Sequence, residues 1–146
     1  KKVKLLKPNV TSQQLDLIKK FYNDNLKIIV PSLLYNSNNH IYAILPQFPE
    51  LKGVKVLRNG LYLGECKKGR FEPSHSLALT LNMDDVKRYY NFKNDDIEVV
   101  KYIHGETLIG NNQKGYGLIL VDGYPLSFYK ESNNQVKNLY PKGLRR

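Results

Sequence analysis

The C-terminal residues of this chain combine side-chain types that suit contact with a polyanion. Residues 136–145 carry three cations and no acid, and Arg146 adds a fourth cation directly after them. A tyrosine and an asparagine lie among these charges, together with a proline and a glycine that shape the backbone. Cations neutralise phosphates, an aromatic ring stacks on a base, and an amide bonds to a base edge. A solvated basic tail is the alternative, but a strand pattern precedes the tail and favours an ordered one.

A second basic zone lies at residues 52–70, where six cations face one acid, Glu65. Inside it, Lys67-Lys68-Gly69 before Arg70 is typical of a tight basic turn. The whole chain has a formal net charge of +10, and residues 1–82 hold thirteen cations against five acids. A polyanion relieves the self-repulsion of such an excess. If the fold brought the two basic zones together, they would form one phosphate-binding face.

The remaining reactive side chains form no recognisable catalytic or metal-binding pattern. His40, His75 and His104 are far apart in the sequence, and none is at zinc-ligand spacing from Cys66. A single cysteine cannot form an intrachain disulfide and suits a reducing cytosol. We therefore expect no catalytic residue, no metal site and no cofactor bound by this chain.

Length and composition favour a globular protein. The chain has 146 residues, of which 41% are hydrophobic and 25% charged, so we expect one medium domain or two small ones. No stretch is long and apolar enough to span a membrane, and we expect a cytoplasmic monomer without membrane contact. The only methionine is Met83, which leads us to expect a fragment of a longer protein.

The residue pattern of the first half of the chain predicts a helix followed by strands. Ser12 is a suitable N-cap for a helix over residues 12–26. Two apolar runs, 33–35 and 41–45, flank a turn-forming Asn-Ser-Asn-Asn stretch and predict a hairpin. Further strands are expected at 54–57 and, after an Asn59-Gly60 turn, at 61–63.

The middle of the chain predicts short helices. Ser74 would cap the first, and Leu77, Leu79 and Leu81 would anchor it in the core. Asn82 with the acids that follow would begin another helix that runs to residue 90, and the polar stretch 91–96 is a candidate boundary. A further helix over 97–103 should stop at Gly105.

The C-terminal half is rich in strand signals. Asp122-Gly123 between apolar runs predicts a hairpin of strands 116–121 and 124–129, because a type I′ turn needs positive φ at both central residues. A turn at 132–134 and a strand at 136–139 follow. Lys114-Gly115-Tyr116-Gly117 matches the first half of the RNA-recognition-motif strand signature, but the aromatic positions beyond it are not aromatic here, which favours an ordinary strand start. The fold class is α+β.

Five segments, in this order and spacing, resemble the C-terminal region of the RsmF-type branch of the Nop/Sun family. They are RNGLYLGE (58–65), KKGRFEPSHSLAL (67–79), YIHGETL (102–108), VDGYPL (121–126) and KNLYPKGLR (137–145). Members of this branch are bacterial enzymes that use S-adenosylmethionine to make 5-methylcytosine in small-subunit ribosomal RNA. The resemblance covers most of the chain from about residue 41 onward.

The resemblance implies two domains in this chain, with catalysis assigned to a separate domain of the parent enzyme. A small linking α+β domain would occupy residues 1–81, and a PUA-like, RNA-binding β-barrel with short helices would occupy 82–146. The family's catalytic cysteines lie in Pro-Cys and Thr-Cys motifs, whereas Cys66 follows Glu65, so Cys66 inherits no catalytic role. S-adenosylmethionine and catalysis would belong to a catalytic domain of the parent enzyme, which would be a partner of this chain.

We expect the basic residues to bind small-subunit ribosomal RNA. Lys67, Lys68 and Arg70 would hold phosphates, and Tyr140 and Asn138 would touch a sugar or an unpaired base. The phosphate track would be extended by further cations, namely Lys130, Lys137, Lys142 and Arg145. The alternative is a protein-interaction module that packs on the catalytic domain or on a ribosomal protein, with charge serving only solubility. A standalone enzyme is the least favoured interpretation.

Overall fold

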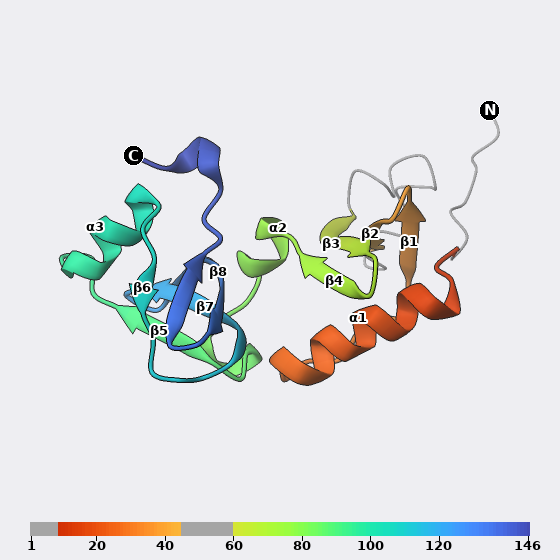
Figure 1. The fold of residues 1–146 in the computed structure, drawn as a ribbon. Coiled ribbons are helices and arrows are strands. Elements are labelled where there is room, and N and C mark those ends of the chain that lie inside the picture. The colour runs from red at the N-terminus through yellow and green to blue at the C-terminus, as the bar shows by residue number, and fades with distance from the viewer. Residues whose placement is uncertain (1–8, 45–59) are drawn as a thin grey trace, which may run out of the picture. The chain divides into compact units, whose positions relative to one another are not determined.

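The computed structural model describes residues 9–44 and 60–146 and divides into two compact units (Figure 1). The first unit comprises the described residues up to Phe21 together with those in Val30–Leu77, and the second comprises Tyr22–Ile29 and Ala78–Arg146. The strand expected at 54–57 and residue Asn59 of the expected turn lie outside the described residues, as do the cations Lys52, Lys55 and Arg58 of the second basic zone.

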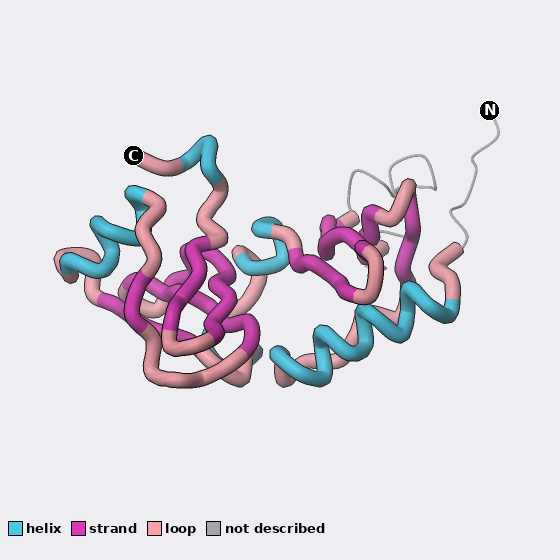
Figure 2. Tube along the Cα trace, viewed as in Figure 1, coloured by secondary structure: helices cyan, strands magenta, loops and turns pink. Residues whose placement is uncertain are grey.

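The first unit is one helix on a four-stranded antiparallel sheet of order β1-β2-β3-β4 (Figure 2). Its elements are α1 (Ser12–Asn25), β1 (Leu34–Ser37), β2 (His40–Ala43), β3 (Leu61–Lys67) and β4 (Arg70–Pro73). The part of α1 in this unit buries Ile18 and Phe21, and the Phe21 ring lies 5.5 Å from that of Phe71 in β4. The core therefore lies between α1 and one face of the sheet.

The start of α1 differs by one residue from the prediction. The N-cap is Thr11 and not Ser12: the Thr11 hydroxyl accepts from the backbone N–H of Gln14 at 3.1 Å, and the Gln14 side-chain oxygen accepts from the Thr11 N–H at 3.1 Å. This reciprocal pair is a capping box with glutamine at the third helical position. Both hydroxyl residues suit an N-cap, and the position of Gln14 favours Thr11.

Two of the turns predicted in the first unit are confirmed. β1 and β2 pair up to Ser37 and His40, and the two asparagines between them have positive φ of 56° and 72°, as a two-residue hairpin turn requires. β3 and β4 pair up to Lys67 and Arg70, which leaves Lys68-Gly69 as the predicted basic turn.

The second unit is built on a five-stranded mixed sheet of order β5-β7-β8-β9-β6. Its strands are β5 (Tyr89–Phe92), β6 (Leu108–Ile109), β7 (Gly115–Val121), β8 (Tyr124–Ser132) and β9 (Gln135–Asn138). β5 is parallel to β7, and the other pairs are antiparallel. Positive φ at Asp122, Gly123, Asn133 and Asn134 confirms both hairpins expected in this half.

The remaining helical elements are short. They are α2 (His75–Ala78), a 3₁₀ helix (Met83–Asp85), α3 (Ile97–His104) and a second 3₁₀ helix (Lys142–Leu144). As expected, the Ser74 hydroxyl caps α2 by accepting from Leu77 N at 3.0 Å, and α3 ends at Gly105, whose φ is 106°. Leu77 and Leu81 are buried, but Leu79 is 52% exposed and anchors nothing.

The expectation of a helix from Asn82 to residue 90 was wrong. Asn82 does form a capping box with Asp85, but the helix stops there after one 3₁₀ turn. Residues 89–92 instead form β5, which pairs in parallel with β7, so this pairing overrides the local helix signal. The polar stretch 91–96 is likewise no boundary, because its first two residues belong to β5 inside the second unit.

A buried cluster of Tyr102, Leu108, Ile119, Tyr129 and Val136 ties α3 to the sheet of the second unit. The Tyr102 hydroxyl donates to Phe128 O at 3.0 Å and accepts from the Ser127 hydroxyl at 3.1 Å. The Tyr129 hydroxyl, by contrast, is buried without a hydrogen-bond partner among the described residues. Burial, the nearby Tyr90 and the charge of Glu131 raise the pKa of Tyr129, which therefore stays neutral at physiological pH.

This difference predicts opposite effects of removing the two hydroxyls. Tyr129→Phe should raise the free energy of unfolding by about 1 kcal/mol, because it removes a polar group that is buried without a partner. Tyr102→Phe should lower it by about 1–2 kcal/mol, because Leu139 N loses its acceptor and Phe128 O, which keeps the Ser127 hydroxyl as a donor, loses one of its hydrogen bonds. Urea unfolding followed by circular dichroism measures both. Equal losses in the two variants would mean that the Tyr129 hydroxyl does have a partner.

The structure confirms the predicted α+β class, and the second unit is a curled sheet with short helices. Among the helices of the described residues, none has the length and apolar character needed to cross a membrane.

Candidate RNA interface

The residues predicted to bind RNA fall into both units. Lys67, Lys68 and Arg70 belong to the first unit, and the other six, from Lys130 to Arg145, belong to the second.

The turn between β3 and β4 carries three cations, two of which pair with one carboxylate. Lys67 Nζ lies 3.0 Å from Glu72 Oε1, and Arg70 donates to Glu72 Oε2 from Nε at 3.0 Å and from Nη2 at 2.9 Å. Burial alone would raise the pKa of Glu72, but the hydrogen bonds and charges of Lys67 and Arg70 hold it below its usual value. Since Lys68 is exposed at the tip, the turn keeps a net positive charge beyond the acid that it neutralises.

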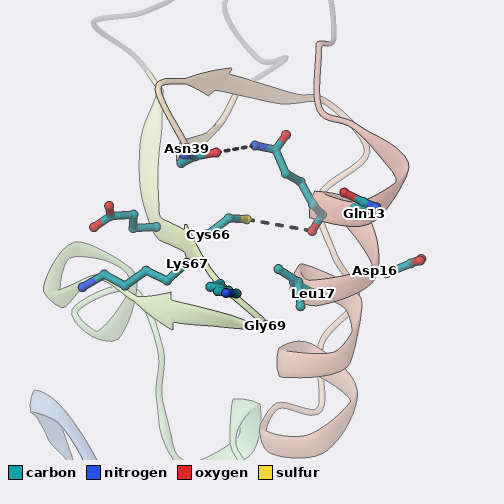
Figure 3. Close-up of a pocket in the computed structure, with 10 residues that line it drawn as sticks. Gln13, Asp16, Leu17, Asn39, Cys66, Lys67 and Gly69 are labelled. Carbon is teal, nitrogen blue, oxygen red and sulfur yellow. Dashed lines mark hydrogen bonds between the residues drawn. The ribbon is translucent and has the colours of Figure 1, made fainter.

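This turn also borders a pocket of about 810 Å³ that lies between the sheet and α1 (Figure 3). The other lining residues are mostly polar, namely Gln13, Gln14, Asp16, Leu17, Asn39, Glu65 and Cys66. Gln14 Nε2 donates to Asn39 Oδ1 at 3.0 Å, so these two amides hold one wall together. In Figure 3 the Lys67 side chain runs away from α1, whereas Cys66 points toward it. Burial, helped by Glu65, raises the pKa of the Cys66 thiol and keeps it protonated and unreactive at neutral pH.

In the second unit, two of the predicted cations face each other across β8 and β9. Lys130 and Lys137 are register partners, and both side chains are exposed. Like charges directly opposite each other on a sheet are destabilising. Lys130 Nζ also lies 5.3 Å from the centre of the Tyr116 ring on β7, and Tyr116 is the register partner of Lys130 on its other side. The row Tyr116–Lys130–Lys137 thus places an aromatic ring beside two cations.

Sequence reasoning did not assign Tyr116 to the site. The sequence held no signal for this pairing: the turn alone would place Tyr116 opposite Tyr129, and the bulge between Ile119 and Leu120 shifts the register so that Lys130 lies opposite instead. Lys142 lies exposed in the second 3₁₀ helix.

The C-terminal residues are ordered by hydrogen bonds to the end of α3, and most of their polar groups are used within the chain. Asn138 Nδ2 donates to Tyr102 O and to Glu106 O, each at 2.8 Å, while its Oδ1 accepts from Tyr140 N at 2.9 Å. Arg145 Nε donates to Tyr140 O at 3.0 Å, and Arg146 N to Ile103 O at 3.1 Å. An RNA contact through the Asn138 amide would cost these bonds.

Asn138→Ala should therefore act on stability more than on RNA affinity. It removes the side-chain donor of Glu106 O and one of the two donors of Tyr102 O, which keeps its bond from Gly105 N. It also frees the tail, so the free energy of unfolding should fall by about 2 kcal/mol. Thermal unfolding by circular dichroism measures this loss. If the variant kept full stability and lost RNA affinity, Asn138 would be an RNA contact and not a clamp for the tail.

Among the described residues, no group of three or more His, Cys, Asp or Glu side chains is placed to hold a metal ion. His40 and His75 lie in the first unit and His104 in the second.

Comparison with known families accounts for nearly the whole chain. Residues 20–81 match the model of the RsmF rRNA methyltransferase first C-terminal domain, and residues 89–146 match that of the methyltransferase RsmF PUA domain. The chain belongs to the RsmF-type methyltransferase family and corresponds to the C-terminal region of its members. This confirms the resemblance inferred from the five segments.

The two candidate surfaces fall on different RsmF domains. The turn with Lys67, Lys68 and Arg70 lies within the match to the first C-terminal domain, and the Tyr116–Lys130–Lys137 row and the ordered tail lie within the match to the PUA domain. Each domain of this RsmF region thus carries its own cationic surface.

Proposed function

We propose that this region binds ribosomal RNA and positions it for the catalytic domain of an RsmF-type methyltransferase. The observation that carries the proposal is the Lys130–Lys137 pair, which the sheet holds side by side with Lys130 over the Tyr116 ring. A bound phosphate would relieve the repulsion between the two ammonium groups, and a neighbouring ring suits a sugar or base. Within the pair's own unit, Lys142 extends the cationic surface, whereas Asn138 and Arg145 hold the tail in place.

The finer part of the proposal follows from the family. The parent enzyme would transfer a methyl group from S-adenosylmethionine to carbon 5 of cytosine in small-subunit ribosomal RNA of a bacterium, as a cytoplasmic monomer. Residues 1–81 would form the linking domain and 82–146 the RNA-binding PUA domain.

The described pocket of the first unit does not fit S-adenosylmethionine. Its described lining offers no aromatic ring for the adenine, and Asp16 and Glu65 only balance Lys67 and Lys68, so the lining presents no net negative charge to the sulfonium cation. We therefore place the cofactor in the catalytic domain of the parent enzyme.

The test compares two double substitutions of equal charge change in the first unit. Lys67→Glu/Lys68→Glu should weaken binding to a ribosomal RNA hairpin and flatten its salt dependence, because two phosphate contacts are lost. Lys19→Glu/Lys20→Glu on α1 is the matched control and should have a much smaller effect. Equal effects would mean that only total charge matters and would remove the turn from the RNA site.

A protein-interaction module remains the second candidate, and one observation favours it. Ile97 and Val100 lie one turn apart on α3 and are each 59% exposed. Such an apolar pair suits contact with another protein surface, such as the catalytic domain. RNA affinity that does not respond to salt, together with loss of catalytic-domain binding in Val100→Asp, would favour this candidate.

A further inference from the structure

The first unit displays a row of three tyrosines on the sheet face opposite its core. Tyr35 of β1 is the register partner of Tyr42 of β2, and Tyr42 is the register partner of Tyr62 of β3. All three side chains are partly exposed. Their neighbours Leu34, Ile41 and Leu63 are buried, so the sheet has an apolar inner face and an aromatic outer face.

A bulge in the β2–β3 pairing keeps this row in register. Ile41 pairs with Gly64 and Tyr42 with Tyr62, so Leu63 is an extra residue on β3. With regular alternation from Gly64, which pairs with the inward-facing Ile41, Leu63 would face outward and Tyr62 would face the core. The bulge therefore lets Leu63 fill the core while Tyr62 joins the aromatic row.

The rings are held by contacts with one another. The Tyr42 and Tyr62 ring centres are 5.1 Å apart, and those of His40 and Tyr62 are 5.6 Å apart. His40 Nδ1 and the Tyr62 hydroxyl share a hydrogen bond of 2.7 Å. Because these side chains are already ordered, a ligand that stacks on them would lose little additional rotamer entropy.

Cations lie on the same face, one row beyond the carboxylates of Glu65 and Glu72. Glu72 carries the ion pairs of Lys67 and Arg70. Burial raises the pKa of Tyr62, and the nearby Glu65, Tyr42 and Glu72 add to that shift. The phenol therefore stays neutral. Toward the β3–β4 turn, the tyrosine row is followed by the register row His40–Glu65–Glu72 and then by Lys67 and Arg70. Lys68 lies at the tip of the turn.

We propose that this aromatic face is a second RNA site, on which unpaired bases of a single-stranded segment stack while Lys67, Lys68 and Arg70 hold the adjoining phosphates. Every base has a π-face that can stack on tyrosine, whereas a duplex hides its bases from such a surface. The proposal rests on the RNA-binding function above and goes further, because it gives the first domain its own ligand, single-stranded RNA.

The test uses a fluorescein-labelled oligouridine of twelve nucleotides and a ribosomal RNA hairpin, each titrated with the whole chain. Tyr42→Leu and Tyr62→Leu should each weaken oligouridine binding roughly tenfold, the effect of losing one stacked base. Tyr42→Phe should bind like the native chain, since phenylalanine keeps the ring. Tyr124→Leu is the control, because Tyr124 is an exposed tyrosine of the second unit.

A second readout does not depend on the leucine variants folding well. The chain contains no tryptophan, so Tyr42→Trp introduces a single reporter whose emission a stacked base should quench on oligouridine addition. Unchanged oligouridine affinity in both leucine variants, or Trp emission that does not respond at saturating RNA, would overturn the aromatic site. If the hairpin still bound, the proposed function would survive that result; if neither RNA bound, both would fall.

Discussion

Lys130→Glu/Lys137→Glu should weaken binding of a ribosomal RNA hairpin by roughly one to two orders of magnitude at 0.1 M salt. Two ammonium groups that face each other across β8 and β9 would become two carboxylates, and these would repel the phosphates that the lysines are proposed to hold. The slope of log affinity against log salt should also fall in size by roughly 1.5, because two phosphate contacts are lost. Fluorescence anisotropy across a salt series measures both quantities.

The control for this experiment keeps the change in net charge and alters its position. Lys93→Glu/Lys101→Glu places the same charges elsewhere in the second unit and should leave most of the affinity in place. Folding is not expected to suffer in the Lys130/Lys137 variant, because both side chains are exposed and one like-charge pair replaces another. A loss no greater than in the control would mean that the row does not touch RNA.

Gly64→Ala should destabilise the first unit by about 3 kcal/mol. Gly64 lies at the β2–β3 bulge with a φ of 151°, and an added Cβ would come within 2.1 Å of Glu72 O in the backbone of β4. A backbone oxygen cannot rotate away as a flexible side chain can, so β3 and β4 would have to separate locally. Urea unfolding of the Gly64→Ala variant and of the native chain measures the effect.

Gly69→Ala is the matched control, because Gly69 also has positive φ, 76°, but a Cβ there would meet nothing within 4 Å. That substitution should lower the free energy of unfolding by only about 1 kcal/mol, the cost of an alanine at positive φ. The difference between the two variants therefore isolates the close approach at the bulge. Equal losses would show that the bulge tolerates a side chain and that the register of Tyr62 does not depend on glycine.

Local turn chemistry explains which elements the sequence predicted well. The hairpins at Asp122-Gly123 and Asn133-Asn134 were predictable because those residues tolerate the positive φ values that the structure has. The end of α3 at Gly105 was predictable for the same reason. In each case the decisive information lies within a few residues of the turn.

Elements that depend on distant partners were missed. The Asn82–Asp85 capping box is a genuine local signal for a helix start, but only the parallel partner β7 makes a strand of Tyr89–Phe92. β6 has two residues and exists through its pairing with β9. The sequence of a short segment without clear hydrophobic periodicity does not reveal which distant strand it pairs with.

In the candidate site, too, features set by nearby residues were predictable, and features set by distant strand partners were not. The cations and the basic turn could be found from composition and turn residues, but the facing of Lys130 and Lys137 follows from register. Asn138 was expected at the RNA, and only the folded tail reveals that its amide bonds to Tyr102 O and Glu106 O. The tyrosine row also depends on the register of three strands and on the bulge beside Gly64.

The central claim, that this region recruits ribosomal RNA, is tested most directly by anisotropy of the chain with a structured small-subunit ribosomal RNA hairpin across salt concentrations. The account predicts a steep fall of log affinity with log salt and a preference for the RNA over duplex DNA of equal charge. Absence of binding at low salt would contradict it, and would assign the cationic surfaces to solubility and the domains to protein contact.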